Sequence, residues 1–566
     1  MREPGLLVVD VAHPDAGPDL DSAARALREI GDARVEHAAP APGVVVVLSK
    51  GLRTSTGPFV VPDRPMPTGI VPPGAVAWTT PDGWCATSDT AGIHHVYWRQ
   101  GRGWGAISTS AVALGRLGGS GPDRDALGVA ALAGHALESA TVVSDVRLLQ
   151  AGELCELSEG RVDVSRVAPP PALDADGWID EMAAIRRTGA EVVVSIVDDA
   201  LQTTSSPVLE LSGGLDSRVL LAAIPPERRA GLPAFTLSHP GGADEAIAVE
   251  IARRNDLDHR CIDMTELADT PADEAEALVV AAGREADWSG NAVALGMLRW
   301  AESRVGDNRP RLSGQNGEFG RGFYYAALPR WIPNVDSSVR ALGRWRVLAN
   351  DRVDAELLRP EALAHAEHEA LAALRRLVRP GPFLASTDEL YLDMRMGRWL
   401  GPAYTVASRS RAVLAPFLDD RYLSWVRSVS PTRRRGSRAL AAVLHELDAG
   451  LASLPLAGGP PPRVLAEGGL TSARATAPRF TRKVVAKARQ RVRPISRPPV
   501  GAGALAALVQ RAWMQRPDAL EAAAGSPLVR PEIVLEIARG SRPAGAATVG
   551  FLVALEELER LGHARG

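Results

Sequence analysis

Cysteine is scarce in this 566-residue sequence, which contains only Cys85, Cys155 and Cys261. Three scattered cysteines provide neither a disulfide framework nor the paired spacing of a structural zinc site. Their scarcity predicts a protein of a reducing compartment, where thiols stay reduced.

A strong net charge and long apolar runs are also missing. The formal net charge is −3, so no general electrostatic attraction to nucleic acid is expected. No run of 18 uncharged apolar residues occurs, and Asp10 interrupts the start of the chain before a signal-like apolar segment develops. We therefore expect a cytoplasmic protein with neither a membrane nor a nucleic-acid partner.

The overall composition is that of a folded, globular protein. Hydrophobic residues make up 46% and charged residues 23% of the chain. Its length is several times that of a typical domain, which predicts two or more domains. The proline-rich residues 168–172 have the composition of a stiff linker. We therefore divide the chain into residues 1–170 and residues 171–566.

The first part has the sequence pattern of a β-rich domain. Short apolar or alternating runs are separated by Gly, Pro and Asp, which is typical of layered β structure. Residues 89–98 are expected to form a hairpin. The predicted strands are residues 6–11, 44–48, 75–79, 84–88, 94–99 and 104–108, and the predicted helices are residues 21–30 and 123–133.

The second part alternates between strands and helices. After a long amphipathic helix at residues 178–203, strand patterns at 208–211, 233–239 and 259–262 alternate with helix patterns at 216–224 and 245–255. This alternation predicts a parallel, doubly wound sheet, in which ligands bind at the carboxyl ends of the strands. Helices are expected from about residue 341 onward, including 361–377, 388–399 and 547–561.

Residues 208–218 form the stretch around which the second part is organised. A short apolar strand leads through Ser212, Gly213 and Gly214 into a helix that begins at Asp216. Backbone N–H groups at a helix N-terminus bind phosphate, and glycines let the backbone approach it closely. A carboxylate beside phosphate is favourable when a magnesium ion lies between them. The alternative is an ordinary Gly-Gly turn with serines there by chance.

These motifs resemble those of a known superfamily. Residues 212–217 resemble the S-G-G-x-D-S pyrophosphate loop of ATP pyrophosphatases. Residues 313–318 are similar to the S-G-x-G-x-D-E loop of asparagine synthetases, with Glu318 in the place of the acid that completes the magnesium site. Residues 409–419 are similar to the R-x-P-F-L-D segment of the same family. A plain glycine loop remains the alternative for residues 313–318.

The resemblance implies a specific fold for each part. Residues 1–170 would be a degenerate, Ntn-type glutamine-amidotransferase-like β sandwich. Residues 171–566 would be an ATP-pyrophosphatase (adenine nucleotide α-hydrolase-like) parallel sheet with a helical C-terminal part.

Two departures from the family pattern bear on activity. The amidotransferase nucleophile is a cysteine at position 2, where this chain has Arg2, and Cys85 falls within a predicted strand. We therefore expect no glutaminase activity. The family lysine that meets the triphosphate is replaced by Arg438, which keeps the charge but cannot donate a proton at neutral pH. A purely structural role in a helix stays open for Arg438.

The resemblance also implies the ligands and the residues that bind them. ATP and Mg²⁺ would be the cofactors, with Asp216 and Glu318 as metal ligands and, together with Arg438, as catalytic residues. Trp288 and Asn291 would face the acyl substrate, although core packing is an equal alternative for Trp288. The residues expected to bind ATP are Leu211, Ser212, Gly213, Gly214, Leu215, Asp216, Ser217, Leu237, Ser313 and Gly314.

Lasso peptide cyclases and β-lactam synthetases share this two-domain layout without the cysteine nucleophile. We expect the cyclase activity: an Asp or Glu side chain of a precursor peptide is activated as an acyl-adenylate and attacked by the peptide's N-terminal amine. A leader peptidase and a leader-recognition protein are possible partners. The alternatives are a β-lactam synthetase-like or ammonia-dependent asparagine synthetase-like amide ligase, and a non-catalytic ATP-binding module.

A basic segment lies near the C-terminal end of the chain. Residues 474–497 carry nine Lys or Arg residues and no acid, within a segment of changed composition at 457–505. This pattern predicts a solvated linker or a patch that attracts an acidic peptide. Base stacking is not expected, because Phe480 is the only aromatic residue among these charges.

Overall fold

The computed structural model describes residues 6–12, 18–30, 36–38, 44–48, 59–60, 76–80, 83–166, 177–468 and 501–563, apart from 205, 240, 307, 326–334, 349–350, 379–382 and 517. The linker predicted at residues 168–172 and the basic segment 474–497 lie outside these ranges. No helix within them is long and apolar enough to cross a membrane.

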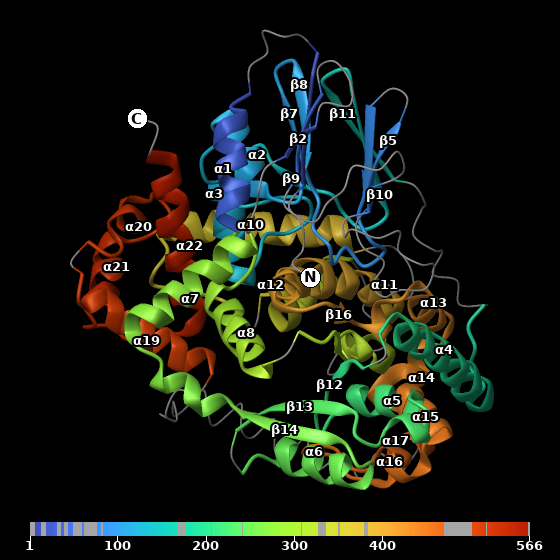
Figure 1. Ribbon diagram of the computed structural model, residues 1–566. Coiled ribbons are helices and arrows are strands. Elements are labelled where there is room, and N and C mark those ends of the chain that lie inside the picture. Colours follow the sequence, from blue (N-terminus) through green and yellow to red (C-terminus); the bar gives the residue numbers. More distant parts are fainter. Residues whose placement is uncertain are drawn as a thin grey trace.

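The N-terminal part contains two antiparallel sheets (Figure 1). The first has the order β2 (Glu36–Ala38), β3 (Val44–Leu48), β1 (Leu6–Val11), β8 (Trp104–Ser108), β7 (Tyr97–Gly101), β9 (Arg147–Leu148). The second has the order β11 (Arg161–Arg166), β10 (Glu153–Ser158), β6 (Gly83–Thr87), β5 (Val76–Thr80), β4 (Phe59–Val60).

The first sheet is buried on both faces. Val8 and Ile107 pack in one cluster with Cys155 and Leu157 of the second sheet. Leu7 and Val9 point the other way, into a cluster that contains residues of α1 (Leu20–Ile30), α2 (Ala111–Gly118) and α3 (Arg124–Ala133). Burial of both faces explains why β1 begins with four consecutive apolar residues, 6–9, rather than an alternating pattern.

The hairpin predicted at residues 89–98 is wrong. The strands β6 and β7 belong to different sheets, and the chain between them crosses from one sheet to the other. The buried Asp89 carboxylate accepts hydrogen bonds from the backbone N–H groups of Ala91, Ile93 and His94, at 3.0, 3.1 and 2.7 Å. Because this side chain satisfies the amides of the crossing segment, no strand partner is needed there.

The second part contains the expected parallel sheet, which lies at the bottom of Figure 1. Its order is β14 (Asp258–Asp263), β13 (Pro233–Ser238), β12 (Val208–Glu210), β15 (Arg311–Leu312), β16 (Val413–Leu414). The neighbouring helices are α4 (Met182–Thr203), α5 (Asp216–Ala223), α6 (Ala243–Arg254) and α15 (Arg438–Leu447). β12 is the central strand. Because β12 pairs in parallel with both β13 and β15, the loops that follow these three strands open at the same edge of the sheet.

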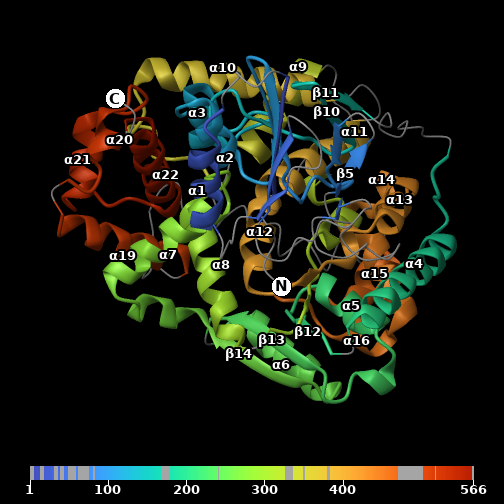
Figure 2. The same ribbon diagram turned by 45° about the horizontal axis from the view of Figure 1, so that its top comes forward.

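Helices make up the rest of the described chain. The predicted helix at 388–399 is α11 (Phe383–Leu390) followed by a π-helical segment, η6 (Tyr391–Leu400), and π turns are frequent at functional sites. Helices α19 and α22 contact α7 and α8, and α22 lies beside α1 in both views (Figures 1 and 2). The main helices are α7 (Ala272–Glu285), α8 (Ala292–Val305), α9 (Val335–Leu342), α10 (Pro360–Leu377), α12 (Gly401–Ser410), α13 (Asp420–Ser428), α17 (Pro462–Glu467), α19 (Ala502–Met514), α21 (Pro531–Ala538) and α22 (Ala546–His563).

Candidate functional site

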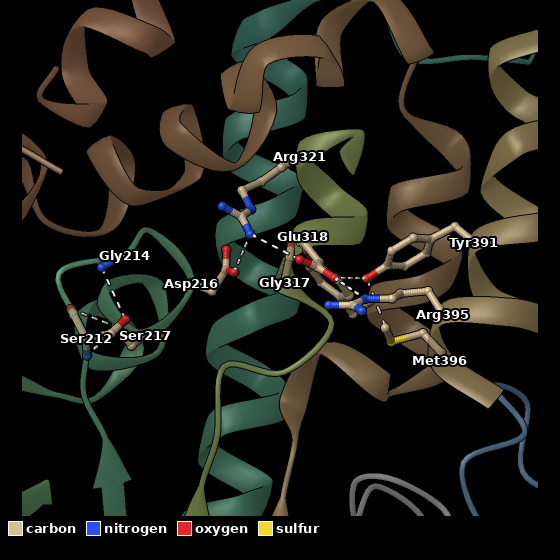
Figure 3. Close-up of polar contacts among 11 residues, drawn as sticks. Ser212, Gly214, Asp216, Ser217, Gly317, Glu318, Arg321, Tyr391, Arg395 and Met396 are labelled. Carbon is tan, nitrogen blue, oxygen red and sulfur yellow. Dashed lines mark hydrogen bonds and ion pairs between the residues drawn. The ribbon is translucent and has the colours of Figure 1, made fainter. Parts of the chain in front are cut away.

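The loop between β12 and α5 is stabilised by hydrogen bonds of its two serines, Ser212 and Ser217. The Ser212 and Ser217 hydroxyl oxygens lie 3.0 Å apart, and the Ser212 backbone N–H donates to the Ser217 hydroxyl at 3.1 Å (Figure 3). The Gly214 backbone N–H donates to the Ser212 hydroxyl at 3.2 Å. These bonds give the loop a compact shape at the N-terminus of α5, where a helix binds anions.

Arg218 fixes this loop to another part of the chain. Its side chain is fully buried and donates to the carbonyl oxygens of Gly213 and Leu454, at 3.0 and 2.9 Å. On the other side of the loop, the Asp244 carboxylate accepts from the Gly213 backbone N–H at 3.0 Å. A carboxylate therefore already binds one N–H group of this loop, as expected of an anion-binding turn.

The loop after β15 packs directly against Asp216. A Cβ atom at Gly317 would lie 2.6 Å from the Asp216 Cγ, and one at Gly314 would lie 3.2 Å from the Asp216 Cβ. Only glycine fits at position 317 without displacing the carboxylate. Ser313 of the same loop donates to the Glu210 carboxylate at 2.6 Å, so the ends of β12 and β15 are joined by side chains as well as by the sheet.

Asp216 and Glu318 face one common cation. The Arg321 Nη2 atom lies 3.0 Å from the Asp216 Oδ2 and 3.7 Å from the Glu318 Oε2 (Figure 3). Burial raises the pKa of Asp216 to about 6; Arg321 acts to lower it and Glu318 to raise it. The two carboxylates thus form a concentrated negative site that attracts a cation.

Glu318 is also held from its other side. The Tyr391 hydroxyl donates to the Glu318 Oε1 at 2.9 Å, and the Arg395 Nε lies 3.4 Å from the same oxygen. Sequence reasoning did not single out Arg321, Tyr391 or Arg395. The available signals were weak: Arg321 follows Glu318 by three residues, and Tyr391 and Arg395 are four residues apart on a predicted helix.

A cavity of about 510 Å³ opens beside these loops, within the usual size range for small-ligand sites. Its polar side is formed mainly by the ends of β12 and β15. Its apolar side is formed by residues of α8, η6 and α12, including Leu295, Leu298, Trp399, Leu400 and Ala403. The predicted residues that line it are Leu211, Ser212, Asp216, Ser217, Leu237, Asn291, Ser313, Gly314 and Glu318.

Two of the predicted site residues lie elsewhere. Trp288 is only 4% exposed, and its ring packs against Gly283 in the core, where a side chain at position 283 would otherwise lie. Arg438 begins α15 and donates to the carbonyl oxygens of Ala466 and Glu467, at 3.4 and 3.3 Å. Gly213, Gly214 and Leu215 belong to the loop but not to the cavity lining.

The acid pair fits a magnesium ion that also takes ligands from phosphate and water. The Asp216 Oδ1 is buried and has no hydrogen-bond partner among the residues that the structure describes, whereas Oδ2 contacts Arg321. Within the described part of the chain, no group of three or more His, Cys, Asp or Glu residues is placed to hold a metal by itself. Mg²⁺ is commonly bound in this way, by one or two carboxylates together with substrate phosphates.

Cys85 lies in the middle of β6, as predicted, and is buried. Burial and the neighbouring Glu156 raise the pKa of its thiol. A thiol with a raised pKa is a poor nucleophile, because the thiolate is the reactive form.

A scan against protein-family models finds no match, and a search of curated proteins finds none either. The functional assignment therefore depends on the geometry of the site and on the motif resemblance.

Proposed function

We propose that the chain is an ATP-dependent, AMP-forming carbon–nitrogen ligase of the asparagine-synthetase type. The observation that carries this proposal is the meeting of Asp216 and Glu318 around one cation position, beside a serine–glycine loop at a helix N-terminus. In finer detail, residues 1–170 would be a degenerate Ntn-type amidotransferase-like sandwich, and residues 171–566 an ATP-pyrophosphatase-type sheet with its helical extension.

The serine–glycine loop would bind the triphosphate of ATP. The hydroxyls of Ser212 and Ser217 and the N–H groups at the start of α5 are the donors available there. Asp216 and Glu318 would hold Mg²⁺, which when bound neutralises phosphate charge and orients the reacting group. Leu211 and Leu237 line the cavity at the ends of β12 and β13 and would contact the nucleoside.

The reaction would proceed in two steps. A substrate carboxylate attacks the α-phosphorus of ATP, pyrophosphate leaves, and an acyl-adenylate forms. An amine then attacks the acyl carbon, AMP leaves, and an amide bond results. The apolar wall formed by α8, η6 and α12 would exclude water and so protect the acyl-adenylate from hydrolysis.

For the substrate we propose a precursor peptide that is closed into a macrolactam, as in lasso peptide cyclases. Two exposed aromatic side chains contact the Arg395 guanidinium of the cavity wall: Phe323 is 43% and Trp399 is 37% exposed. This exposed surface supports a substrate that extends beyond the cavity. Exposed aromatic side chains of this kind are typical of protein and peptide contacts. A leader peptidase and a leader-recognition protein would then be natural partners.

Nucleotide product analysis tests this function. The full chain is incubated with Mg-ATP and one of three acceptor sets: aspartate with ammonium, β-amino acid derivatives, or a short peptide with N-terminal Gly and an internal Asp or Glu. AMP and pyrophosphate with the peptide alone, together with loss of one water from the peptide by mass, support the cyclase. AMP with the small acids supports an amide or lactam synthetase instead. ATP binding without turnover in any set points to a binding module.

A further inference from the structure

Arg321 is held against the acid pair by the same loop that supplies Glu318. It ends the short 3-10 helix η3 (Gly317–Arg321), and the next residue, Gly322, has φ of 60° and donates its N–H to the Phe319 carbonyl oxygen at 3.2 Å. Gly322 thus has a left-handed backbone conformation, which glycine adopts without strain. The Arg321 guanidinium contacts both Asp216 and Glu318.

Arg321 leaves part of its buried hydrogen-bonding capacity unused. Its Nη2 contacts both carboxylates, while its buried Nε has no hydrogen-bond partner in the described part of the chain. The Asp216 Oδ1 likewise has none. Burial lowers the pKa of the guanidinium, but Asp216 and Glu318 raise it, so Arg321 is a charged partner of the pair. Arg321 and Asp216 therefore each have one buried polar atom that a bound ligand can still satisfy.

We propose that Arg321 is an internal counter-ion, which fills the metal position until Mg-nucleotide binds and then turns to the phosphate oxygens. This inference rests on the proposed function, because it needs a nucleotide at the loop formed by residues 212–217. The guanidinium presents several N–H donors in a planar fork that matches phosphate, and its unused Nε provides a further donor. The movement would leave both carboxylates free to bind the metal.

Coupled entry of metal and nucleotide follows from this exchange. A free divalent cation must displace Arg321 from two carboxylates and leaves the guanidinium buried without a partner, which is costly. Mg-ATP brings four phosphate-borne negative charges that accept the displaced guanidinium. The site should therefore bind a free divalent cation weakly and the cation–nucleotide complex tightly.

The test is Mn²⁺ binding to the purified full chain, measured from the EPR signal of free Mn²⁺ with and without α,β-methylene-ATP and corrected for the Mn²⁺ that the analogue binds without protein. The wild type should bind Mn²⁺ roughly 10- to 100-fold more tightly when the analogue is present, the range expected for one hydrogen bond to a charged group. R321Q should bind Mn²⁺ alone more tightly than the wild type by a similar factor, and the analogue more weakly. R321K, which keeps the charge, should resemble the wild type more than R321Q does.

R346Q is the matched control, since Arg346 donates to the Tyr324 carbonyl oxygen outside the acid pair and should leave both affinities unchanged. Equal Mn²⁺ affinity of the wild type and R321Q without nucleotide would overturn the inference, as would metal-independent binding of the analogue to the wild type. If R321Q does not fold, tight Mn²⁺ binding by the nucleotide-free wild type would overturn it equally. Failure of the wild type to bind the analogue under any condition would instead contradict the proposed function.

Discussion

The Asp287 Oδ1 atom lies 2.7 Å from the Ser110 hydroxyl and 3.0 Å from the Val112 backbone nitrogen. Ser110 caps α2 in the N-terminal part, and Asp287 lies in the turn between α7 and α8. This turn is strained, since Asp287 and Trp288 have φ values of 49° and 58°, and it leads directly to Gly290 and Asn291 of the cavity wall. The N-terminal part therefore supports a wall of the candidate site.

Removing the Ser110 hydroxyl should destabilise the protein. Ser110→Ala leaves a buried carboxylate short of one donor, so the free energy of unfolding should fall by about 1–3 kcal/mol. Urea unfolding measures this change. Ser120→Ala is the control, because its hydroxyl contacts Asp145 at an exposed position and its loss should cost less than about 0.5 kcal/mol. Equal effects of the two substitutions would contradict a structural role for the contact between Ser110 and Asp287.

Asp287 should make the stability depend on pH. Burial raises its pKa to about 6, against an ordinary value of 3.8, although hydrogen bonds from Ser110 and Val112 and the charge of Arg409 on α12 act to lower it. Tyr97 on β7 also faces it. Because the folded state holds this proton more tightly than the unfolded state, the contribution of Asp287 to stability falls as pH rises from about 4 to about 6 and is constant above that.

The matching measurement is thermal unfolding of the wild type and of Asp287→Asn across that pH range. The amide oxygen can still accept from Ser110 and Val112 but does not titrate. The melting temperature of the variant relative to the wild type should rise between about pH 4 and pH 6, by an amount equivalent to roughly 3 kcal/mol at most. A difference that is independent of pH would contradict the raised pKa.

Gly317→Ala should impair the site without unfolding the chain. The added Cβ would lie 2.6 Å from the Asp216 Cγ, so the carboxylate must move. A displacement of about 1 Å in a catalytic group can lower the rate by roughly 100-fold. ATP consumption and the melting temperature should be measured together. Gly121→Ala is the control, because its Cβ would meet no atom within 4 Å; similar rates for the two variants would contradict the close packing of Gly317 on Asp216.

Features encoded by contiguous residues could be predicted from the sequence. The strands β1 and β8 have the predicted bounds, because both are short segments of mainly apolar residues. The loop at residues 212–217 could be located for the same reason, since its strand, its glycines and its helix follow one another directly. Its neighbour at 313–318 followed from a second local motif.

Features that depend on distant residues could not be predicted. Tyr391 and Arg395 reach Glu318 across more than seventy positions of sequence, through a π-helical segment whose register differs from that of the predicted α-helix. The Trp288 ring is buried against Gly283 of α7, and this position depends on the packing of α7 against α8. The segment at residues 89–98 has turn residues that are equally compatible with a hairpin and with a crossing between two sheets, so the sequence pattern cannot separate the two.

The transfer of carboxylate oxygen to AMP tests the proposed chemistry most directly. The substrate is a peptide with N-terminal Gly and an internal Asp or Glu whose side-chain carboxylate is labelled with ¹⁸O. It is incubated with the full chain and Mg-ATP, and the masses of the products are measured by mass spectrometry. Adenylation predicts one ¹⁸O atom in AMP, none in pyrophosphate, and no AMP with Asp216→Asn. ADP with ¹⁸O in inorganic phosphate, or full activity of Asp216→Asn, would contradict adenylation at the Asp216 and Glu318 site.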